Sequence, residues 1–207
     1  FDSRLLRQGE LFVALSGQRD GHDFVPAAMA AGAAAVLASK PLAPEIPAIY
    51  VEDTRAALQS IAREYRKTLS CTVIGITGSV GKTTTKEMVA AVLETTQSTV
   101  KTEKNYNNDL GVPVMLLRLT PQTQAAVLEM GMNHFGELSL LTSLVRPELA
   151  VITNVGTMHI ENLGSREGIL KAKLEILEGL QPGGTCYFCG DNDLLRREAV
   201  AHHAVTF

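Results

Sequence analysis

The segment VIGITGSVGKTTTKEM, residues 73–88, contains the residues whose types and order most clearly indicate chemistry. An apolar run ends in a glycine-rich stretch, which is followed by a lysine and three threonines. A loop of this kind between a strand and a helix presents backbone N–H groups around a concavity, and phosphate oxygens can approach closely because side chains are few. Lys82 would then reach the β and γ phosphates of a nucleotide, and the Thr83 hydroxyl would complete the shell of a magnesium ion.

This segment matches a variant of the phosphate-binding string G-x-x-x-x-G-K-[ST], because Ile76 occupies the position of the first glycine. The alternative is a glycine-rich turn followed by a solvated lysine. Strand, loop, lysine and hydroxyl nevertheless occur in the order that a phosphate site requires. We therefore expect the chain to bind a nucleoside triphosphate.

Two further polar residues follow apolar runs of strand length. Glu129 lies at the end of AAVLEM, and His159 follows LAVITNV. Ligands of parallel α/β sheets gather beyond the carboxyl ends of the strands, so both residues could lie near Lys82. Glu129 could hold magnesium or could be an exposed carboxylate without a task. His159 could be a ligand or a structural residue, and the residues alone leave both choices open.

A lysine lies within an apolar stripe of the helix expected over residues 167–180. At roughly 100° per residue, Lys173 falls on the apolar side of this helix, whereas Lys171 and Glu175 point the other way. The apolar residues on that side are Ile169, Leu177 and Leu180. Burial of a charged lysine is unfavourable, so the pKa of Lys173 should be depressed unless its stem carries the ammonium to solvent or an acid pairs with it.

Two groups of elements are needed to position these residues. The first group, before residue 70, has strands expected at residues 10–15, 34–39 and 48–53 and helices at residues 24–33 and 54–70. The second group has strands expected at residues 72–77, 125–130, 149–155 and 185–188, several of them separated by helical patterns. Buried strands that alternate with helices predict an α/β fold: a small N-terminal α/β domain, residues 1–69, and a mostly parallel, doubly wound domain, residues 70–207.

Composition narrows the classes of partner. The 207 residues are 45% hydrophobic and 20% charged, and the formal net charge is -3. Charges of both signs are interspersed, so we expect no nucleic-acid partner. The longest stretch of low polarity, residues 27–38, is about half the length needed to span a bilayer, so we expect no membrane insertion. We expect a monomer in the cytoplasm. Cys186 and Cys189 form a C-x-x-C string, but no second pair accompanies it, so we expect structural thiols in preference to a redox or metal site.

The strings GITGSVGKTTTKEM, TEKNYNNDLGVPVMLL, LEMGMNHFGEL and ITNVGTMHIENLGSREGILKAKLEIL, together with DSR near the start, resemble the Mur ligase family. The resemblance extends in order over nearly the whole chain. Members of this family are ATP-dependent amide-forming enzymes that build the peptide stem of the cell wall, and each has three domains. The resemblance implies the same activity for the protein to which this chain belongs. The chain resembles most of the UDP-substrate domain and the front part of the ATPase domain, so we expect both to be incomplete and the third to be absent.

The resemblance also implies roles for individual residues. Thr83 and Glu129 are similar to ligands of a first magnesium ion, and His159 to a ligand of a second. Lys173 occupies the position of the family's carbamylated lysine, whose carbamate helps to hold the second ion. The implied ATP phosphate loop comprises Gly78, Ser79, Val80, Gly81, Lys82, Thr83 and Thr84.

Other implied roles concern the nucleotides of ATP and of the UDP-sugar. Asn107 and Asn108 match asparagines of the family's N-x-N-N string and are assigned to ATP binding. Ser3 and Arg4 match a string near the uridine end of the UDP-sugar site. Cys189 stands where the family often has an asparagine near the nucleotide base, so we assign no adenine contact to it.

Within the family, NYNNDLGVP and EMGMNHFGE favour the member that joins D-alanyl-D-alanine to UDP-N-acetylmuramoyl-tripeptide. The implied reaction forms an acyl phosphate on the tripeptide carboxylate, and the dipeptide amine then attacks it. One alternative is another Mur-type ligase, such as the one that adds the third residue. The other is a nucleotide-binding subunit without catalysis, which binds a partner.

Overall fold

A computed structural model describes residues 2–17 and 19–207, and the chain forms two compact units. The first unit ends at Ile61, and the second extends from Ala62 to Phe207. This division lies within the helix α2 (Thr54–Lys67). The domain division expected between residues 69 and 70 lies just beyond the end of that helix.

The first unit is built on a small parallel sheet with the order β1-β2-β3. Its strands are β1 (Leu11–Val13), β2 (Ala35–Ala38) and β3 (Ala48–Tyr50), and its helical elements are the 3₁₀ helix η1 (Gly21–Phe24) and α1 (Val25–Ala30). Pro26 lies in the first turn of α1, where its missing N–H leaves no helical hydrogen bond unmade. The core of this unit packs Phe12 and Val36 of the sheet against Ala28 of α1.

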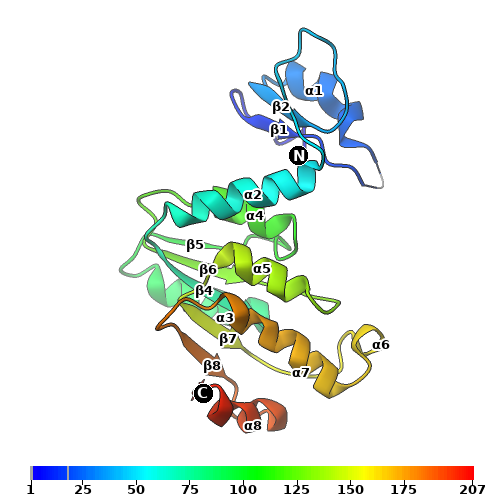
Figure 1. Cartoon of the computed structure of the whole chain (residues 1–207). Helices are drawn as coiled ribbons and strands as arrows, with labels where there is room; N and C mark the ends of the chain where they lie inside the picture. The colour runs from blue at the N-terminus through cyan, green and yellow to red at the C-terminus, as the bar shows by residue number, and fades with distance from the viewer. Residues whose placement is uncertain (1, 18) are drawn as a thin grey trace. The chain divides into compact units, whose positions relative to one another are not determined.

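The second unit contains a six-stranded sheet with the order β5-β6-β4-β7-β8-β9, in which every pairing is parallel (Figure 1). Its strands are β4 (Thr72–Thr77), β5 (Thr99–Lys101), β6 (Ala125–Glu129), β7 (Leu149–Ile152), β8 (Thr185–Phe188) and β9 (Val205–Thr206). Gly75 of the central strand β4 pairs with Leu128 on one side and Ala150 on the other. This register places the carboxyl ends of β4, β6 and β7 side by side.

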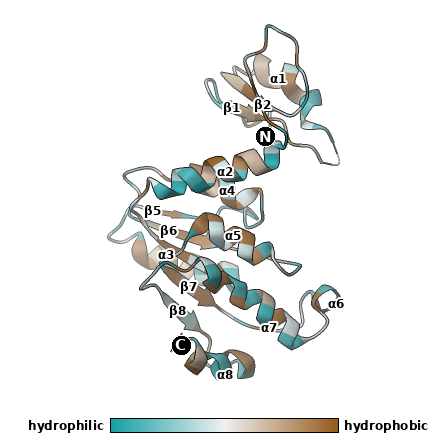
Figure 2. Cartoon of the chain, in the orientation of Figure 1, coloured by the Kyte–Doolittle hydropathy of each residue, from teal (hydrophilic) through white to brown (hydrophobic). Residues whose placement is uncertain are grey.

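Helices cover both faces of this sheet, which confirms the predicted doubly wound α/β class (Figure 1). The helices are α3 (Lys82–Leu93), α4 (Gly111–Leu117), α5 (Glu137–Val145), α6 (Ile160–Leu163), α7 (Arg166–Leu174) and α8 (Asp193–Ala201), with the 3₁₀ helix η2 (Glu175–Gly179) after α7. On one face α4, α5 and α7 contribute to the large core, whereas α3 packs on the other face through Ala90. Figure 2 shows the central strands in the colour of apolar residues, as expected for strands buried on both faces.

The helix expected over residues 167–180 is divided in two. The α-helix ends at Leu174, and a 3₁₀ helix continues to Gly179. Neighbouring α5 explains the change, because the Thr142 hydroxyl donates to the Ile176 carbonyl oxygen at 2.8 Å and so draws this segment against α5. A side chain at Gly179 would collide with the Thr142 carbonyl oxygen, so only glycine permits the close approach.

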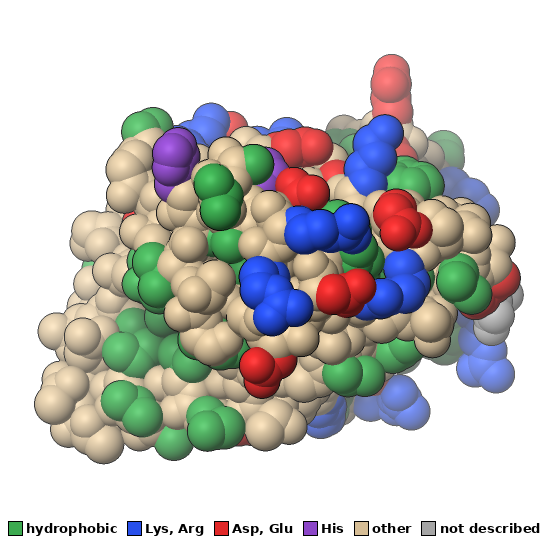
Figure 3. Space-filling view, turned by 90° about the horizontal axis from the view of Figure 1, so that it is seen from below, with side chains coloured by type: hydrophobic (Ala, Val, Ile, Leu, Met, Phe, Trp, Pro, Cys, Tyr) green, Lys and Arg blue, Asp and Glu red, His purple; other side chains and the backbone are tan. Residues whose placement is uncertain are grey.

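Acidic and basic side chains alternate on the face of the second unit that carries α8 (Figure 3). Arg166 and Asp193, for example, form an ion pair of 2.6 Å. Among the described residues, no helix combines the length and the apolar character needed to cross a bilayer.

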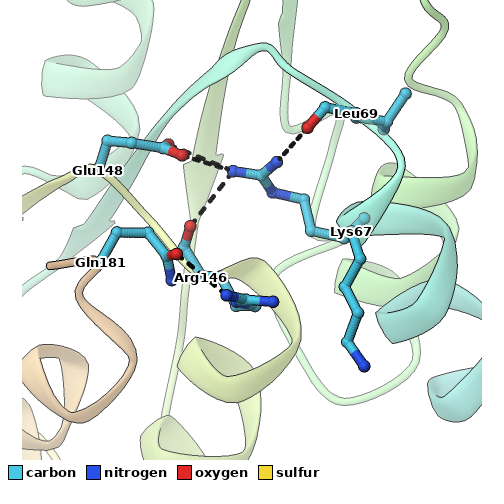
Figure 4. Close-up of a pocket in the computed structure, with 6 residues that line it drawn as sticks. Lys67, Leu69, Arg146, Glu148 and Gln181 are labelled. Atoms are coloured by element: carbon cyan, nitrogen blue, oxygen red, sulfur yellow. Dashed lines mark hydrogen bonds and ion pairs between the residues drawn. The ribbon is translucent and has the colours of Figure 1, made fainter.

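Arg66, in the last turn of α2, joins several elements at the amino edge of the large sheet (Figure 4). Its guanidinium donates at 2.9–3.2 Å to three carbonyl oxygens, those of Leu69, Val145 and Arg146. It also pairs with Glu148 at 2.9 Å, and Glu148 Oε2 accepts the backbone N–H of Val73 at 2.6 Å. These contacts lie beside a pocket of about 150 Å³, which Lys67 and Gln181 also line.

We expect Arg66→Met to lower the free energy of unfolding by about 3 kcal/mol, because it leaves several carbonyl groups and the Glu148 carboxylate without their donor. Urea unfolding followed by circular dichroism measures this loss. The matched control is Lys67→Met, since Lys67 pairs with the exposed Glu64, and its loss should cost less than about 1 kcal/mol. Equal effects of the two variants would contradict the role given to Arg66.

Candidate active site

The carboxyl edge of the large sheet carries a tight loop between β4 and α3. Gly81 has a φ of +85° and precedes the first residue of α3, Lys82. Gly78 has a φ of +152°, and a side chain there would collide with the Thr153 hydroxyl. Glycine is therefore required at both positions, by backbone conformation at Gly81 and also by space at Gly78.

The residues after β7 hold this loop in place. The Thr153 hydroxyl donates to the Val80 carbonyl oxygen at 2.6 Å. Ser79 is fixed from both sides, because its N–H donates to the Asn154 carbonyl oxygen and its Oγ accepts the Gly156 N–H, each at 2.9 Å. Sequence analysis missed the role of Thr153. The available signal was a polar residue at the end of an otherwise apolar strand.

Lys82 lies across the loop. Its ammonium donates to the Gly78 carbonyl oxygen at 2.7 Å. Burial lowers the pKa of Lys82, and the negative charge of Glu129 opposes that shift. A lysine beside a glycine-rich loop at the start of a helix is suited to bind phosphate oxygens.

Glu129, the last residue of β6, is buried and hydrogen-bonded, so the alternative of an exposed carboxylate without a task is wrong. The side chain of Thr83 donates to Glu129 Oε2 at 3.0 Å, and Asn107 Nδ2 donates to Oε1 at 2.9 Å. Only 4% of Glu129 is exposed. A second contact fixes Asn107, whose carbonyl oxygen accepts the N–H of Gly131 just beyond β6. Thr83, Glu129 and Asn107 thus form one cluster at the edge that carries Lys82.

Asn108 contributes to the local fold beside this cluster. Its Oδ1 accepts the N–H groups of Gly111 at 2.8 Å and Leu110 at 3.2 Å, at the start of α4. This arrangement satisfies donors that the helix itself leaves free. The amide oxygen of Asn108 is therefore engaged with the backbone.

The oxygens of Thr83 and Glu129 fit a magnesium ion. Two oxygen ligands at right angles around Mg²⁺ lie about 3.0 Å apart, and the Thr83 Oγ1 to Glu129 Oε2 distance is 3.0 Å. In residues 2–17 and 19–207 no three His, Cys, Asp or Glu side chains are grouped as metal ligands. The protein oxygens would thus supply part of a shell that phosphate and water complete, as is usual for Mg²⁺.

Lys173 is buried on α7, as predicted, and only 3% of the residue is exposed. Ile169 is buried on the same helix and Lys171 is exposed, as the predicted helical phase requires. The prediction was wrong for Glu175, which lies beyond the end of α7, is half-buried and accepts the N–H groups of Gly136 and Ser139. The pKa of Lys173 falls to about 7, first because of burial and second because of the nearby positive charge of Lys82. The alternative of a stem that carries its ammonium to solvent is therefore wrong, and Lys173 lies within electrostatic reach of the phosphate loop.

His159 lies beyond β7 and immediately precedes α6. Its φ is +64°, an uncommon conformation for a residue with a side chain, and the residue is half-buried. Among the residues that the structure describes, no hydrogen bond or ion pair joins its imidazole to Glu129 or Lys173. The structure places His159 on the expected edge of the sheet and leaves its ligand role a prediction.

Ser3 and Arg4 belong to the first unit, where exposed Arg4 pairs with Asp2 at 2.7 Å and lowers the pKa of that carboxyl to about 2. Cys186 is buried in β8, and Cys189 is half-buried just after it. Both are free thiols, as expected.

Two family models match the chain. The model described as Mur ligase middle domain matches residues 76–207. The model described as Mur ligase family, catalytic domain matches residues 1–66.

Two curated relatives are both UDP-N-acetylmuramoyl-tripeptide--D-alanyl-D-alanine ligases. The protein from Bacillus subtilis (strain 168) is 51% identical over 199 residues, which are 94% of this chain and 44% of that protein. The protein from Escherichia coli (strain K12) is 47% identical over 193 residues, which are 93% of this chain and 43% of that protein. The chain therefore spans less than half the length of these relatives.

Solved structures give the same result. MurF from Acinetobacter baumannii is 39% identical with a TM-score of 0.91, and the match covers 99% of this chain and 46% of that one. MurF from Thermotoga maritima in complex with ADP is 35% identical with a TM-score of 0.89, over 99% and 48% of the two chains. A UDP-N-acetylmuramoyl-L-alanyl-D-glutamate--2,6-diaminopimelate ligase is 19% identical with a TM-score of 0.57, which shows a shared fold alone.

We expect the free energy of unfolding to rise with pH between about 7 and 10 through Lys173. The pKa is about 7 in the folded chain, against an ordinary value of 10.5. In this window the unfolded state therefore binds the additional proton, and stability increases as pH rises. Lys173→Met should flatten this part of the profile and add about 3 kcal/mol of stability near pH 6.

Urea unfolding at several pH values in buffer free of carbon dioxide measures this effect. The control is Lys171→Met, because Lys171 is exposed on the same helix, and it should keep the slope of the unchanged chain. Parallel profiles for the unchanged chain and Lys173→Met would refute the depressed pKa.

Proposed function

The chain belongs to the Mur ligase family, and we propose that it provides the ATP site of a ligase that joins D-alanyl-D-alanine to UDP-N-acetylmuramoyl-tripeptide. The observation that carries the proposal is the cluster of Thr83, Glu129 and Asn107 beside a glycine loop that is crossed by Lys82. Similarity to relatives that are ligases of this specificity supports the choice of substrates.

In this proposal residues 78–84 surround the phosphates of ATP, and Lys82 binds the β and γ phosphates. The loop needs little rearrangement, because Thr153 and Ser79 already fix its backbone. The complex of Thermotoga maritima MurF with ADP supports the binding of an adenine nucleotide. Asn107 and Asn108 stand near the nucleotide, and Asn107 also orients Glu129.

Two sets of residues would each hold one magnesium ion. Thr83 and Glu129 would hold a first ion, and His159 together with a carbamate on Lys173 would hold a second. Carbamylation requires a neutral amine, and the lowered pKa of Lys173 supplies one near pH 7. When bound, these ions neutralise the charge that develops on the transferred phosphoryl group.

The reaction then proceeds in two steps. A carboxylate oxygen of the tripeptide attacks the γ-phosphorus, the bond to the ADP oxygen breaks, and an acyl phosphate forms. The amine of D-alanyl-D-alanine next attacks the acyl carbon and loses a proton, and inorganic phosphate leaves. Both steps concentrate negative charge, which Lys82 is placed to stabilise.

The first unit would bind the UDP-sugar end of the substrate through Ser3 and Arg4. We also propose that the protein acts as a monomer in the cytoplasm, where ATP and nucleotide-linked sugars are available.

Phosphate release with UDP-N-acetylmuramoyl-tripeptide, with and without the dipeptide, tests the function. Release that requires both substrates supports this ligase. Release driven by a free amino acid in place of the dipeptide would support a different Mur-type ligase.

Lys82→Ala should lower turnover by several powers of ten and leave affinity for the UDP-substrate nearly unchanged, because this lysine acts on developing charge. Turnover can be measured in a chimaera in which residues 1–207 replace the matching part of the Bacillus subtilis relative. Near-normal turnover of the variant would contradict the proposal that residues 78–84 bind the phosphates of ATP.

Lys173→Ala should abolish most activity of the same chimaera, and added short carboxylates should restore part of it. A small carboxylate can occupy the space of the carbamate and supply oxygens to the second magnesium ion. Lys171→Ala, on the exposed face of α7, should be nearly silent. If Lys171 proves the sensitive position, or if no carboxylate rescues Lys173→Ala, the carbamate proposal fails.

A further inference from the structure

A second lysine of the phosphate-loop helix, Lys86, is almost completely buried, with 2% exposed. Its ammonium donates to the Thr102 carbonyl oxygen at 2.7 Å. It also pairs with Glu87 at 2.9 Å, and Glu87 is half exposed. The proposed function gives no task to this charge, although Lys86 is only one helical turn from Thr83.

Thr102, which follows the edge strand β5, connects Lys86 to the candidate metal ligand. Its hydroxyl accepts the backbone N–H of Glu129 at 2.9 Å. Its own N–H donates to the Val127 carbonyl oxygen at 3.0 Å, so its position is fixed against β6. One residue therefore receives Lys86 through its carbonyl group and holds Glu129 through its side chain.

These contacts close a ring between α3 and the end of β6. Thr83 and Lys86 lie three positions apart on α3 and so share one face of the helix. Thr83 contacts the Glu129 carboxylate directly, and Lys86 reaches the Glu129 backbone through Thr102. The ring fixes both the main chain and the carboxylate of Glu129 relative to the helix that begins at Lys82.

We propose that Lys86 is a positioning residue for magnesium: through Thr102 it sets the backbone of Glu129, so that the carboxylate and the Thr83 hydroxyl present oxygens to one ion. The inference rests on the proposed function. An apolar residue at position 86 would avoid the unfavourable burial of a charge. Ala90, one turn later on α3, is buried in this way. The Thr102 carbonyl, however, would then lose its lysine donor, and the anchor of Glu129 would loosen.

The test measures ADP affinity of the 207-residue chain by titration calorimetry, once with magnesium chloride and once with EDTA. The ratio of the two affinities is the magnesium effect. Lys86→Met should reduce this effect about tenfold or more, as is usual when the partner that orients a metal ligand is lost. Affinity in EDTA should change less than twofold. Lys86→Arg, which keeps a donor, should recover part of the effect.

Three further variants separate positioning from general stability. Glu87→Gln removes the ion pairs of Glu87 with Lys86 and with Lys101 and leaves the Thr102 contact, so its magnesium effect should equal that of the unchanged chain. Thr102→Val removes the acceptor for the Glu129 N–H and should reproduce Lys86→Met, whereas Thr102→Ser should not. The two Thr102 variants keep the test decisive if Lys86→Met does not fold.

A magnesium effect that stays unchanged in Lys86→Met or in Thr102→Val would overturn the inference, even if the melting temperature falls, because Lys86 would then only fasten α3 to β5. The proposed function fails differently. If the unchanged chain binds ADP equally well with magnesium and with EDTA, the magnesium assignment itself is refuted before any variant is compared.

Discussion

The buried carboxylate of Glu129 needs hydrogen-bond donors, and this need governs how residues are arranged at the carboxyl edge of the large sheet. Glu129 ends a central strand, where water cannot satisfy its oxygens, and an unpaired charge there would be strongly unfavourable. Its partners come from three separate segments: Thr83 from the loop helix, Asn107 from the connection after β5, and the hydroxyl of Thr102 for its backbone N–H. The carboxylate therefore fixes the mutual positions of the elements that a nucleotide and a magnesium ion would contact.

Three lysines near the carboxyl edge of the large sheet differ in the groups that surround their amines. Lys82 has the loop carbonyl of Gly78 and the opposing charge of Glu129. Lys86 has a carbonyl and a carboxylate within hydrogen-bond distance. For Lys173 the electrostatic influence comes from another positive charge, so both burial and neighbour favour the neutral amine. Lys86 and Lys173 are buried and Lys82 is half-buried, so the groups around each ammonium, and not burial alone, distinguish the three lysines.

Sequence predicts the features that depend on local pattern. The strands at residues 72–77 and 185–188 have the predicted bounds, and the helical phase that buries Lys173 is correct, because continuous apolar runs and a 3.6-residue period are visible in single segments. The short edge strands β5 and β9 were not predicted, since their residues are half-buried or exposed and carry little apolar signal. Thr102 and the end of α7 at Leu174 depend on contacts between segments far apart in sequence, which no local pattern records. For Thr153 the sequence shows only a polar residue after an apolar run, and its contact with Val80 is visible in the structure alone.

The two edges of the large sheet use polar groups in opposite ways. At the amino edge the Arg66 guanidinium is surrounded by carbonyl oxygens and the Glu148 carboxylate, beside the pocket of about 150 Å³. Among the described residues, the buried side-chain atom without a hydrogen-bond partner is the Thr77 hydroxyl, directly before the phosphate loop. Native interiors rarely leave such a group unpaired. The two edges thus differ in how their polar groups are used: those around Arg66 pair with one another, whereas the Thr77 hydroxyl at the start of the phosphate loop has no partner among the described residues.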